Sequence, residues 1–295
     1  MYILNFIRGF LMALADSVPG VSGGTIAFIL GFYDDFINSL NSLMTKNSMK
    51  ERLVGLKFLG RLGIGWITGM ILSVLFLTSF FESSIYSVSS LFTGFVLLSI
   101  PLIIIEEREN IVGKYKNLIF TLIGIIVVVL LTFFNPSSNG SGVSLAFGDL
   151  NLFLIIYVFV AAMIAISAMV LPGISGSSLL LIFGIYTGII SSIRQVLSLN
   201  FNYLPILIIF TFGVLAGIAT TIKSIRYVLR THRTQAIYTI IGLMLGSLYA
   251  IFEGPTTLEI PHPAMTFETF DFLFFFIGAA LIFALDRIKV FFQKK

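Results

Sequence analysis

Residues 15–37 read ADSVPGVSGGTIAFILGFYDDFI, and residues 168–190 read AMVLPGISGSSLLLIFGIYTGII. At a shift of 153, nine of the 23 aligned positions are identical. The shared core is a Pro-Gly-x-Ser-Gly break inside apolar sequence. Because lipid cannot satisfy the backbone groups that such a break frees, the break must lie within protein or line a wet cavity. Two matched breaks, one per half, are typical of carriers that build a site near the bilayer midplane from internal repeats.

The composition indicates a polytopic α-helical membrane protein. Hydrophobic residues make up 57% of the 295 residues and charged residues only 11%, and apolar stretches of nearly bilayer-spanning length recur along the chain. The absence of cysteine excludes a disulfide framework and cysteine metal sites. Ala13-Leu14-Ala15 resembles a signal-peptidase site, but Arg8 lies inside the preceding apolar stretch rather than ahead of it, so we expect the N-terminus to be retained.

The apolar segments divide into five per half, separated by a Ser/Gly/Asn/Pro-rich stretch at 135–150 that reads as an exposed loop. We therefore expect a first repeat at 1–134, a linker loop at 135–150 and a second repeat at 151–295. Each repeat would hold a broken or re-entrant helical hairpin and three transmembrane helices. The ten segments are 3–15, 21–44, 58–81, 86–105, 117–134, 151–171, 174–193, 204–222, 236–252 and 270–285.

The basic residues predict the orientation in the membrane. Four basic clusters alternate with three connections, 82–85, 135–150 and 253–269, that hold no Lys or Arg. By the positive-inside rule the clusters and both termini are cytoplasmic, which leaves Arg194 as the one external basic residue. The clusters are Lys46, Lys50, Arg52, Lys57 and Arg61; Arg108, Lys114 and Lys116; Lys223, Arg226, Arg230 and Arg233; and Arg287, Lys289, Lys294 and Lys295.

This orientation predicts that the two repeats are inverted relative to each other. The first motif segment, 3–44, would start and end inside, and the second, 151–193, would start and end outside. Each is either two full crossings or a hairpin that re-enters on the same side. The short first arm and the Pro-Gly break favour the re-entrant hairpin.

The paired motifs have the chemistry of an anion site. After each break a helix restarts, and its first free N–H groups carry a partial positive charge that suits phosphate or carboxylate. Serine and threonine hydroxyls add donors, and glycine lets a ligand approach the backbone. The alternative is that the glycines serve only close helix packing. The candidate substrate-binding residues are Pro19, Gly20, Ser22, Gly23, Gly24 and Thr25, and Pro172, Gly173, Ser175, Gly176, Ser177 and Ser178.

Three charged residues near the motifs are further candidates. Asp16 is an acid deep in apolar sequence, so it is a candidate proton carrier or cation ligand, and its alternative role is to cap the broken helix. Arg8 lies about two turns earlier and either pairs with Asp16, helps to hold an anion or extends to the surface. Arg194 either contacts an anionic headgroup or is solvated. His232 and His262 form no metal-binding pattern.

The string Asp16-Ser17-Val18-Pro19-Gly20-Val21-Ser22-Gly23-Gly24-Thr25 resembles a bacterial membrane family of polyprenyl-phosphate transporters (PopT), over nearly the whole chain. The resemblance implies a lipid-phosphate substrate, undecaprenyl phosphate, returned across the cytoplasmic membrane. The motifs also resemble Pro-Gly-x-Ser-Arg-Ser-Gly of undecaprenyl-pyrophosphate phosphatases. Here Gly23 and Gly176 stand at the arginine position and no Glu-x-x-x-Glu pair precedes either break, so we expect phosphate to be held and not cleaved.

The sequence therefore predicts a flippase for undecaprenyl phosphate in the bacterial cytoplasmic membrane. The inverted halves would alternate access to the motif site, with coupling to H⁺ or Na⁺ and Asp16 as the candidate carrier. We expect no cofactor, no catalytic residue, no metal and no nucleic-acid partner, and the sequence leaves the oligomeric state open. Two alternatives remain: a phosphatase-like membrane enzyme and a transporter of a small soluble anion.

Overall fold

The computed structural model describes residues 2–17, 21–44, 48–73, 78–134, 151–257 and 261–293. Within these ranges the chain is helical and contains no β-strand. The expected linker loop, 135–150, lies outside the described residues, as do Pro19 and Gly20 of the first motif. The expectation of an all-α fold is confirmed for the described part of the chain.

The first half begins with the helix α1, and two shorter helices, α2 and α3, follow it. A break separates α1 from α2, and a left-handed turn at Gly31 (φ +65°) separates α2 from α3. Long helices follow, and α5 contains a kink at Ser84. The helices are α1 (Tyr2–Asp16), α2 (Gly23–Ile29), α3 (Tyr33–Met44), α4 (Met49–Leu72), α5 (Thr78–Glu106), α6 (Arg108–Ile111), η2 (Tyr115–Asn117) and α7 (Leu118–Phe133).

The second half repeats this order of helices. At the shift of 153 seen in the sequence, α9 and α10 coincide with α2 and α3 residue for residue, and Gly184 (φ +67°) stands where Gly31 does. The longer helices correspond with small offsets at their ends. They are α8 (Leu152–Met169), α9 (Gly176–Ile182), α10 (Tyr186–Leu197), η4 (Phe201–Tyr203), α11 (Leu204–Thr231), α12 (Arg233–Glu253), η5 (Gly254–Thr257) and α13 (Phe272–Gln293).

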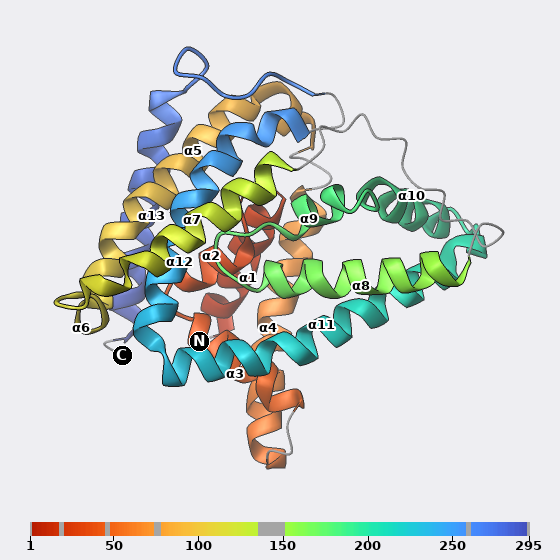
Figure 1. The fold of residues 1–295 in the computed structure, drawn as a ribbon, viewed down its shortest axis with the longest axis horizontal. Helices are drawn as coiled ribbons and strands as arrows, with labels where there is room; N and C mark the ends of the chain where they lie inside the picture. Colours follow the sequence, from red (N-terminus) through yellow and green to blue (C-terminus); the bar gives the residue numbers. More distant parts are fainter. Residues whose placement is uncertain are drawn as a thin grey trace.

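The four main helix pairs fall into two kinds. Within each half, the helix before the break packs along the first long helix after it, α1 on α4 and α8 on α11. Between the halves, the last helix of each packs on a long helix of the other, α7 on α12 and α13 on α5. Figure 1 shows α5, α7, α12 and α13 side by side, with α8 and α11 extending away from them together. The two halves therefore share one helical bundle.

Glycines allow these helices to approach closely. A Cβ added at Gly65 of α4 would collide with the carbonyl of Phe6 on α1. One added at Gly242 of α12 would collide with the carbonyl of Thr121 on α7. Contacts between small residues and backbone are the usual way in which helices associate in lipid, where no hydrophobic force drives them together. Glycine thus serves close helix packing at these positions of α4 and α12.

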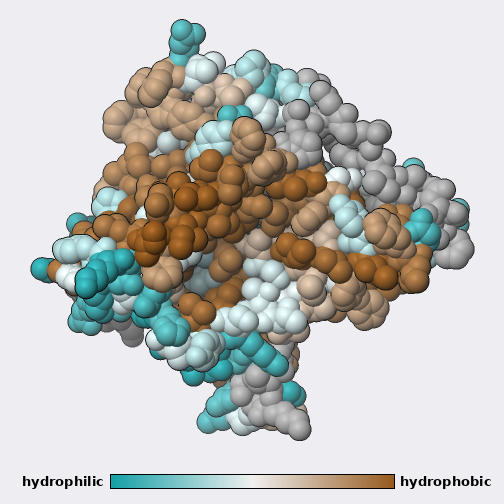
Figure 2. All heavy atoms as spheres, in the orientation of Figure 1, coloured by the Kyte–Doolittle hydropathy of each residue, from teal (hydrophilic) through white to brown (hydrophobic). Residues whose placement is uncertain are grey.

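Six of the described helices are long and apolar enough to cross a membrane, which supports a multi-pass membrane protein. These candidate spans are Met49–Leu72, Ser84–Glu106, Tyr115–Phe133, Leu152–Met169, Phe201–Thr231 and Arg233–Thr256. In Figure 2 hydrophobic residues extend across the middle of the visible face, and hydrophilic residues gather at the end that holds α6 and at the projecting end of α3 and α4. The short helices α2, α3, α9 and α10 do not meet the length of a span.

The main hydrophobic core surrounds the first motif. Ala27 of α2 and Phe32 in the turn after it are fully buried, and Ile37 of α3 is 1% exposed. Ile222 of α11 and Met244 of α12, from the second half, belong to the same cluster. The segment after the first break is thus packed between the two halves of the chain.

Candidate functional site

The break after α1 is bridged by Asp16, the last residue of that helix. Its carboxylate accepts hydrogen bonds from the Gly23 backbone N–H (2.6 Å) at the start of α2 and from the Trp66 indole N–H (2.9 Å) on α4. A Cβ at Gly23 would lie 2.8 Å from a carboxylate oxygen, so only glycine fits here without a shift. The capping role that the sequence offered for Asp16 is therefore present.

Ser22 is the N-cap of α2. Its backbone is extended (φ −132°, ψ 148°), and its hydroxyl accepts a hydrogen bond from the Thr25 N–H (3.3 Å), which satisfies one of the free donors of the helix start. The hydroxyl oxygens of Ser22 and Thr25 lie 3.1 Å apart, and both residues are buried. The helix that restarts after the break begins at Gly23.

The two motifs contact each other directly. The Gly173 N–H donates to the Thr25 hydroxyl (2.8 Å), and the Ser22 hydroxyl donates to the Leu171 carbonyl (3.4 Å). The Tyr33 hydroxyl at the start of α3 donates to the Val170 carbonyl (3.1 Å). We call these three hydrogen bonds, which join residues 22–33 to residues 170–173, the motif seam.

Close backbone packing accompanies the motif seam. A Cβ added at Gly24 would lie 2.9 Å from the Val170 carbonyl oxygen. Gly173 has φ +89°, a left-handed conformation that favours glycine, and it packs against the Leu243 backbone of α12. Glycine is needed at both positions, at one for space and at the other for conformation.

The second motif differs from the first at the position of the acid. Ser175 is the buried, extended N-cap of α9, and Pro172 is buried before it. Gly176 stands where Gly23 does, but it faces Met169 rather than a carboxylate, with the Met169 sulfur 3.1 Å from an added Cβ. Ser177 and Ser178 form the first turn of α9. The acid of the first motif thus has an apolar counterpart.

Arg8 lies close to the first motif but is held by other groups than Asp16. It donates to the Asn5 side-chain oxygen (3.1 Å), and its guanidinium lies 4.6 Å from the centre of the Phe32 ring, a cation–π contact. Phe32 follows the turn that ends α2, so Arg8 is the cation that packs against this segment. Arg194 lies in α10, in the second half of the chain, and follows the motif-seam residues 170–173 by about 20 positions in sequence.

Two residues of this site were missed by reasoning from sequence. Trp66 is the single tryptophan of the chain, and Tyr33 aligns with Tyr186 as one of the nine identities. The single tryptophan and the repeated tyrosine were both visible in the sequence. What each side chain contacts could not be read from it, because Trp66 is 50 residues from Asp16 and Tyr33 is 137 residues from Val170.

Comparison with known proteins agrees with the motif resemblance. A polyprenyl-phosphate transporter of Staphylococcus aureus is 36% identical over 260 residues, which cover 86% of this chain and 88% of that protein. A polyprenyl-phosphate transporter of Vibrio cholerae is 30% identical over 267 residues, 88% of this chain and 80% of that protein. No solved structure matches the chain.

The family model described as "undecaprenyl phosphate translocase-like" matches residues 12–269. This match begins before the first motif and ends before α13, so it includes both motifs and the contacts between them. The chain therefore belongs to the undecaprenyl phosphate translocase-like family.

Proposed function

We propose that this chain is a transporter that moves undecaprenyl phosphate from the outer to the inner leaflet of the bacterial cytoplasmic membrane. The substrate class comes from the family and from two relatives named polyprenyl-phosphate transporters, at 36% and 30% identity over most of the chain. The direction follows from recycling, in which the carrier lipid must return to the cytoplasmic side. The six candidate membrane spans fit a carrier that stays in the bilayer while the lipid crosses.

We propose that the two halves are inverted repeats. In Figure 1 both termini, α6 and the turn between α11 and α12 lie toward one end, and the connection that leads into α13 lies at the opposite end. The C-terminal end, α6 and the turn between α11 and α12 carry basic clusters, so we assign that side to the cytoplasm. The residue-for-residue match of the short helices supports the repeat, and their lengths of 7 and 12 residues support hairpins that re-enter on one side.

We propose that the phosphate binds where the motif seam now closes. In this structure the Ser22 hydroxyl, the Thr25 hydroxyl and the Gly173 N–H satisfy one another or nearby carbonyls. A phosphate that enters between the motifs would replace these partners, so the donors would pass from protein to ligand without being left unpaired. Ser175, Ser177 and Ser178 would supply the matching helix start from the second half. Arg8 is the nearest basic candidate and Arg194 a headgroup contact on the external side.

We propose further that Asp16 couples transport to H⁺ or Na⁺. Its carboxylate is the acid at the break, and the positions around Met169 offer no second one. A proton or Na⁺ bound to the carboxylate would weaken its hydrogen bond with the Gly23 N–H and so loosen the start of α2. Asp16→Asn should make transport insensitive to imposed proton and sodium gradients, whereas a variant that still responds to both would remove Asp16 from this role.

The transport function is tested in proteoliposomes that carry a fluorescent polyprenyl phosphate in one leaflet. We expect the purified protein to make this lipid accessible to a membrane-impermeant quencher on the other side. Two further assays test the alternatives. Uptake of inorganic phosphate without polyprenyl lipid would favour a soluble-anion carrier, and release of phosphate from undecaprenyl pyrophosphate would favour a phosphatase. Failure to move polyprenyl phosphate at all would overturn the proposal.

A further inference from the structure

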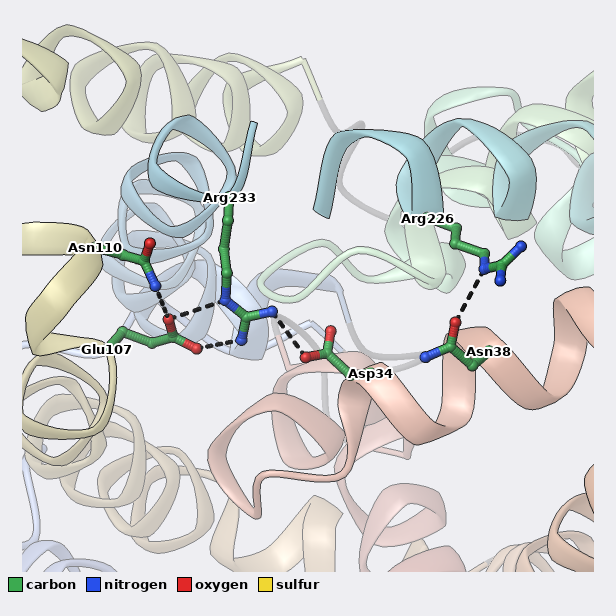
Figure 3. A network of polar contacts seen from close by, with 6 residues as sticks. All are labelled: Asp34, Asn38, Glu107, Asn110, Arg226 and Arg233. Atoms are coloured by element: carbon green, nitrogen blue, oxygen red, sulfur yellow. Dashed lines mark hydrogen bonds and ion pairs between the residues drawn. The ribbon is translucent and has the colours of Figure 1, made fainter. Parts of the chain in front are cut away.

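A second network of polar contacts begins at Asp34, next to Tyr33 of the motif seam, and joins the two halves on the side of the basic clusters (Figure 3). It connects α3 of the first half with the end of α11 and the start of α12 in the second half, and it includes the junction of α5 and α6. The residues in it are Asp34, Asn38, Glu107, Asn110, Arg226 and Arg233.

Arg233 is anchored by Glu107. The Arg233 Nε donates to one carboxylate oxygen of Glu107 (3.1 Å) and a terminal nitrogen donates to the other, which is a bidentate pair. Asn110 donates to the same carboxylate (2.7 Å), and the Glu107 side chain is only 12% exposed. Because α12 also packs on α5 and α6, this pair belongs to the shared bundle. The anchor leaves the remaining guanidinium nitrogen directed at α3.

The contacts that cross to α3 are more open. The third Arg233 nitrogen donates to Asp34 (2.9 Å), whose side chain is 47% exposed, and the Arg226 Nε donates to Asn38 (3.0 Å) one turn further along α3. Since water reaches these groups, separating them leaves no charge buried without a partner. We call the Asp34–Arg233 and Asn38–Arg226 contacts the latch.

The latch has no charged equivalent at the repeat-related positions. At the shift of 153, Asp34 corresponds to Thr187, Arg233 to Phe80 and Glu107 to Ile260. The short helices match residue for residue, so this difference arises inside an otherwise repeated frame. The carrier would have one ion pair and one hydrogen bond to break when it opens on the latch side, and the repeat-related residues hold no charged pair to break on the other.

We propose that the latch is a one-sided gate that holds the cytoplasmic side of the carrier closed between transport cycles. This rests on the proposed function for the orientation and for the need of that side to open. Asp34 and Asn38 move with α3, Glu107 keeps Arg233 in position, and release of the two crossing contacts lets α3 separate from α11 and from the start of α12. The closed latch keeps the cytoplasmic side shut at rest.

The gate is tested by measuring how often α3 and α11 separate. Ile37 of α3 lies three residues from Asp34, is 1% exposed and belongs to the core cluster that includes Ile222 of α11. The chain has no cysteine, so Ile37→Cys gives a single reporter whose maleimide labelling records opening from the cytoplasmic side. Asp34→Asn and Asn38→Ala in this background should each raise the labelling rate, by roughly two- to fivefold for the charged contact.

A matched control removes a neighbouring carboxylate outside the latch. Glu109 lies in α6 two residues from Glu107 and is exposed, so Glu109→Gln makes the same charge change near the same end of the bundle. We expect its labelling rate to equal that of the Ile37→Cys parent. Equal rates in Asp34→Asn, Asn38→Ala and Glu109→Gln would overturn the latch proposal.

Locking the contact tests whether opening is needed for transport. In an Asn38→Cys, Arg226→Cys variant, a short bifunctional thiol reagent should stop polyprenyl-phosphate transport, and a cleavable reagent should restore it on reduction. Full transport by the cross-linked protein overturns the gate and leaves the transport function standing. If instead the unmodified protein carries no polyprenyl phosphate, the proposed function fails, while the labelling difference, which needs no substrate, still reports on the latch.

Discussion

At the scale of single residues, the first motif is held together by hydrogen bonds that reach far along the chain. The sequence singled out Asp16 and foresaw a cap as one of its roles, because an acid just before a broken helix fits the free N–H groups there. It could not foresee Trp66 as the second donor, or that Thr25 would accept from Gly173. Both depend on how helices pack, which periodicity does not encode.

Thr25→Val tests the motif seam at this scale. Valine keeps the shape of threonine but loses the hydroxyl, so the Gly173 N–H is left buried without an acceptor. We expect the free energy of unfolding to fall by about 1–3 kcal/mol and transport to decline. The measurements are thermal unfolding in detergent and the proteoliposome assay, and Thr25→Ser, which keeps the hydroxyl, is the control. A valine variant as stable as the serine variant would contradict the contact.

Trp66→Phe tests the support of Asp16. Phenylalanine retains an aromatic ring but loses the indole N–H that donates to the carboxylate. We expect a loss of about 1–3 kcal/mol in stability, since the hydrogen bond involves a charged acceptor. We also expect transport to decline more when Asp16→Asn is added, because Gly23 then donates to a weaker acceptor. Stability equal to that of the native chain would show that Trp66 only packs there.

At the scale of helices, the two short segments after the breaks end in the same way. The Phe32 N–H bonds to the Ala27 carbonyl and the Ile185 N–H to the Leu180 carbonyl, each around a left-handed glycine, which is the Schellman helix ending. The repeated glycine was visible in the sequence, yet the apolar stretch at 21–44 reads as one continuous segment. A single glycine in an apolar run is too weak a signal to locate a helix end.

The glycines of α4 offer a matched test of close helix packing. Gly65→Ala places a methyl group against the Phe6 backbone of α1, whereas Gly60→Ala on the same helix meets nothing within 4 Å. We expect Gly65→Ala to lower the free energy of unfolding by about 1–3 kcal/mol through overpacking. Gly60→Ala should leave it equal or raise it by up to about 1 kcal/mol. Thermal unfolding of the two proteins decides this, and equal melting temperatures would contradict the packing.

At the scale of the whole molecule, the duplication was readable because its strongest signal is sequence identity at one fixed shift. The order of the described helices follows the apolar segments, and six of these helices are long and apolar enough to span a membrane. Leu152–Met169, expected as a hairpin arm, is one of the six, whereas Phe272–Ala284 in the last segment is shorter. How the last helices pack was not readable. The Leu-Ile-Gly of 122–124 and Phe-Ile-Gly of 276–278 hinted that the last helices correspond, and the structure packs Gly124 on α12 and Gly278 on α5.

The orientation is testable with single cysteines in this cysteine-free chain. Lys57 of α4 is exposed within a basic cluster, and Phe267, in the connection before α13, is 86% exposed. We expect Lys57→Cys to react with an impermeant maleimide only from the cytoplasm and Phe267→Cys only from outside. Permeabilised cells give the full labelling of both. Reaction of both cysteines from the same side would refute the assignment.

The exchange of last helices has a consequence for how such a chain could arise. A polypeptide holding one copy would have its final helix without the partner that α12 gives to α7 and α5 gives to α13. In the proposed inverted arrangement, that partner could come only from a second molecule inserted the opposite way up. A single-copy ancestor would thus have been a dual-topology protein working as an antiparallel dimer. Fusing two genes would then have fixed each orientation, freeing one copy to keep an acid where the other carries methionine.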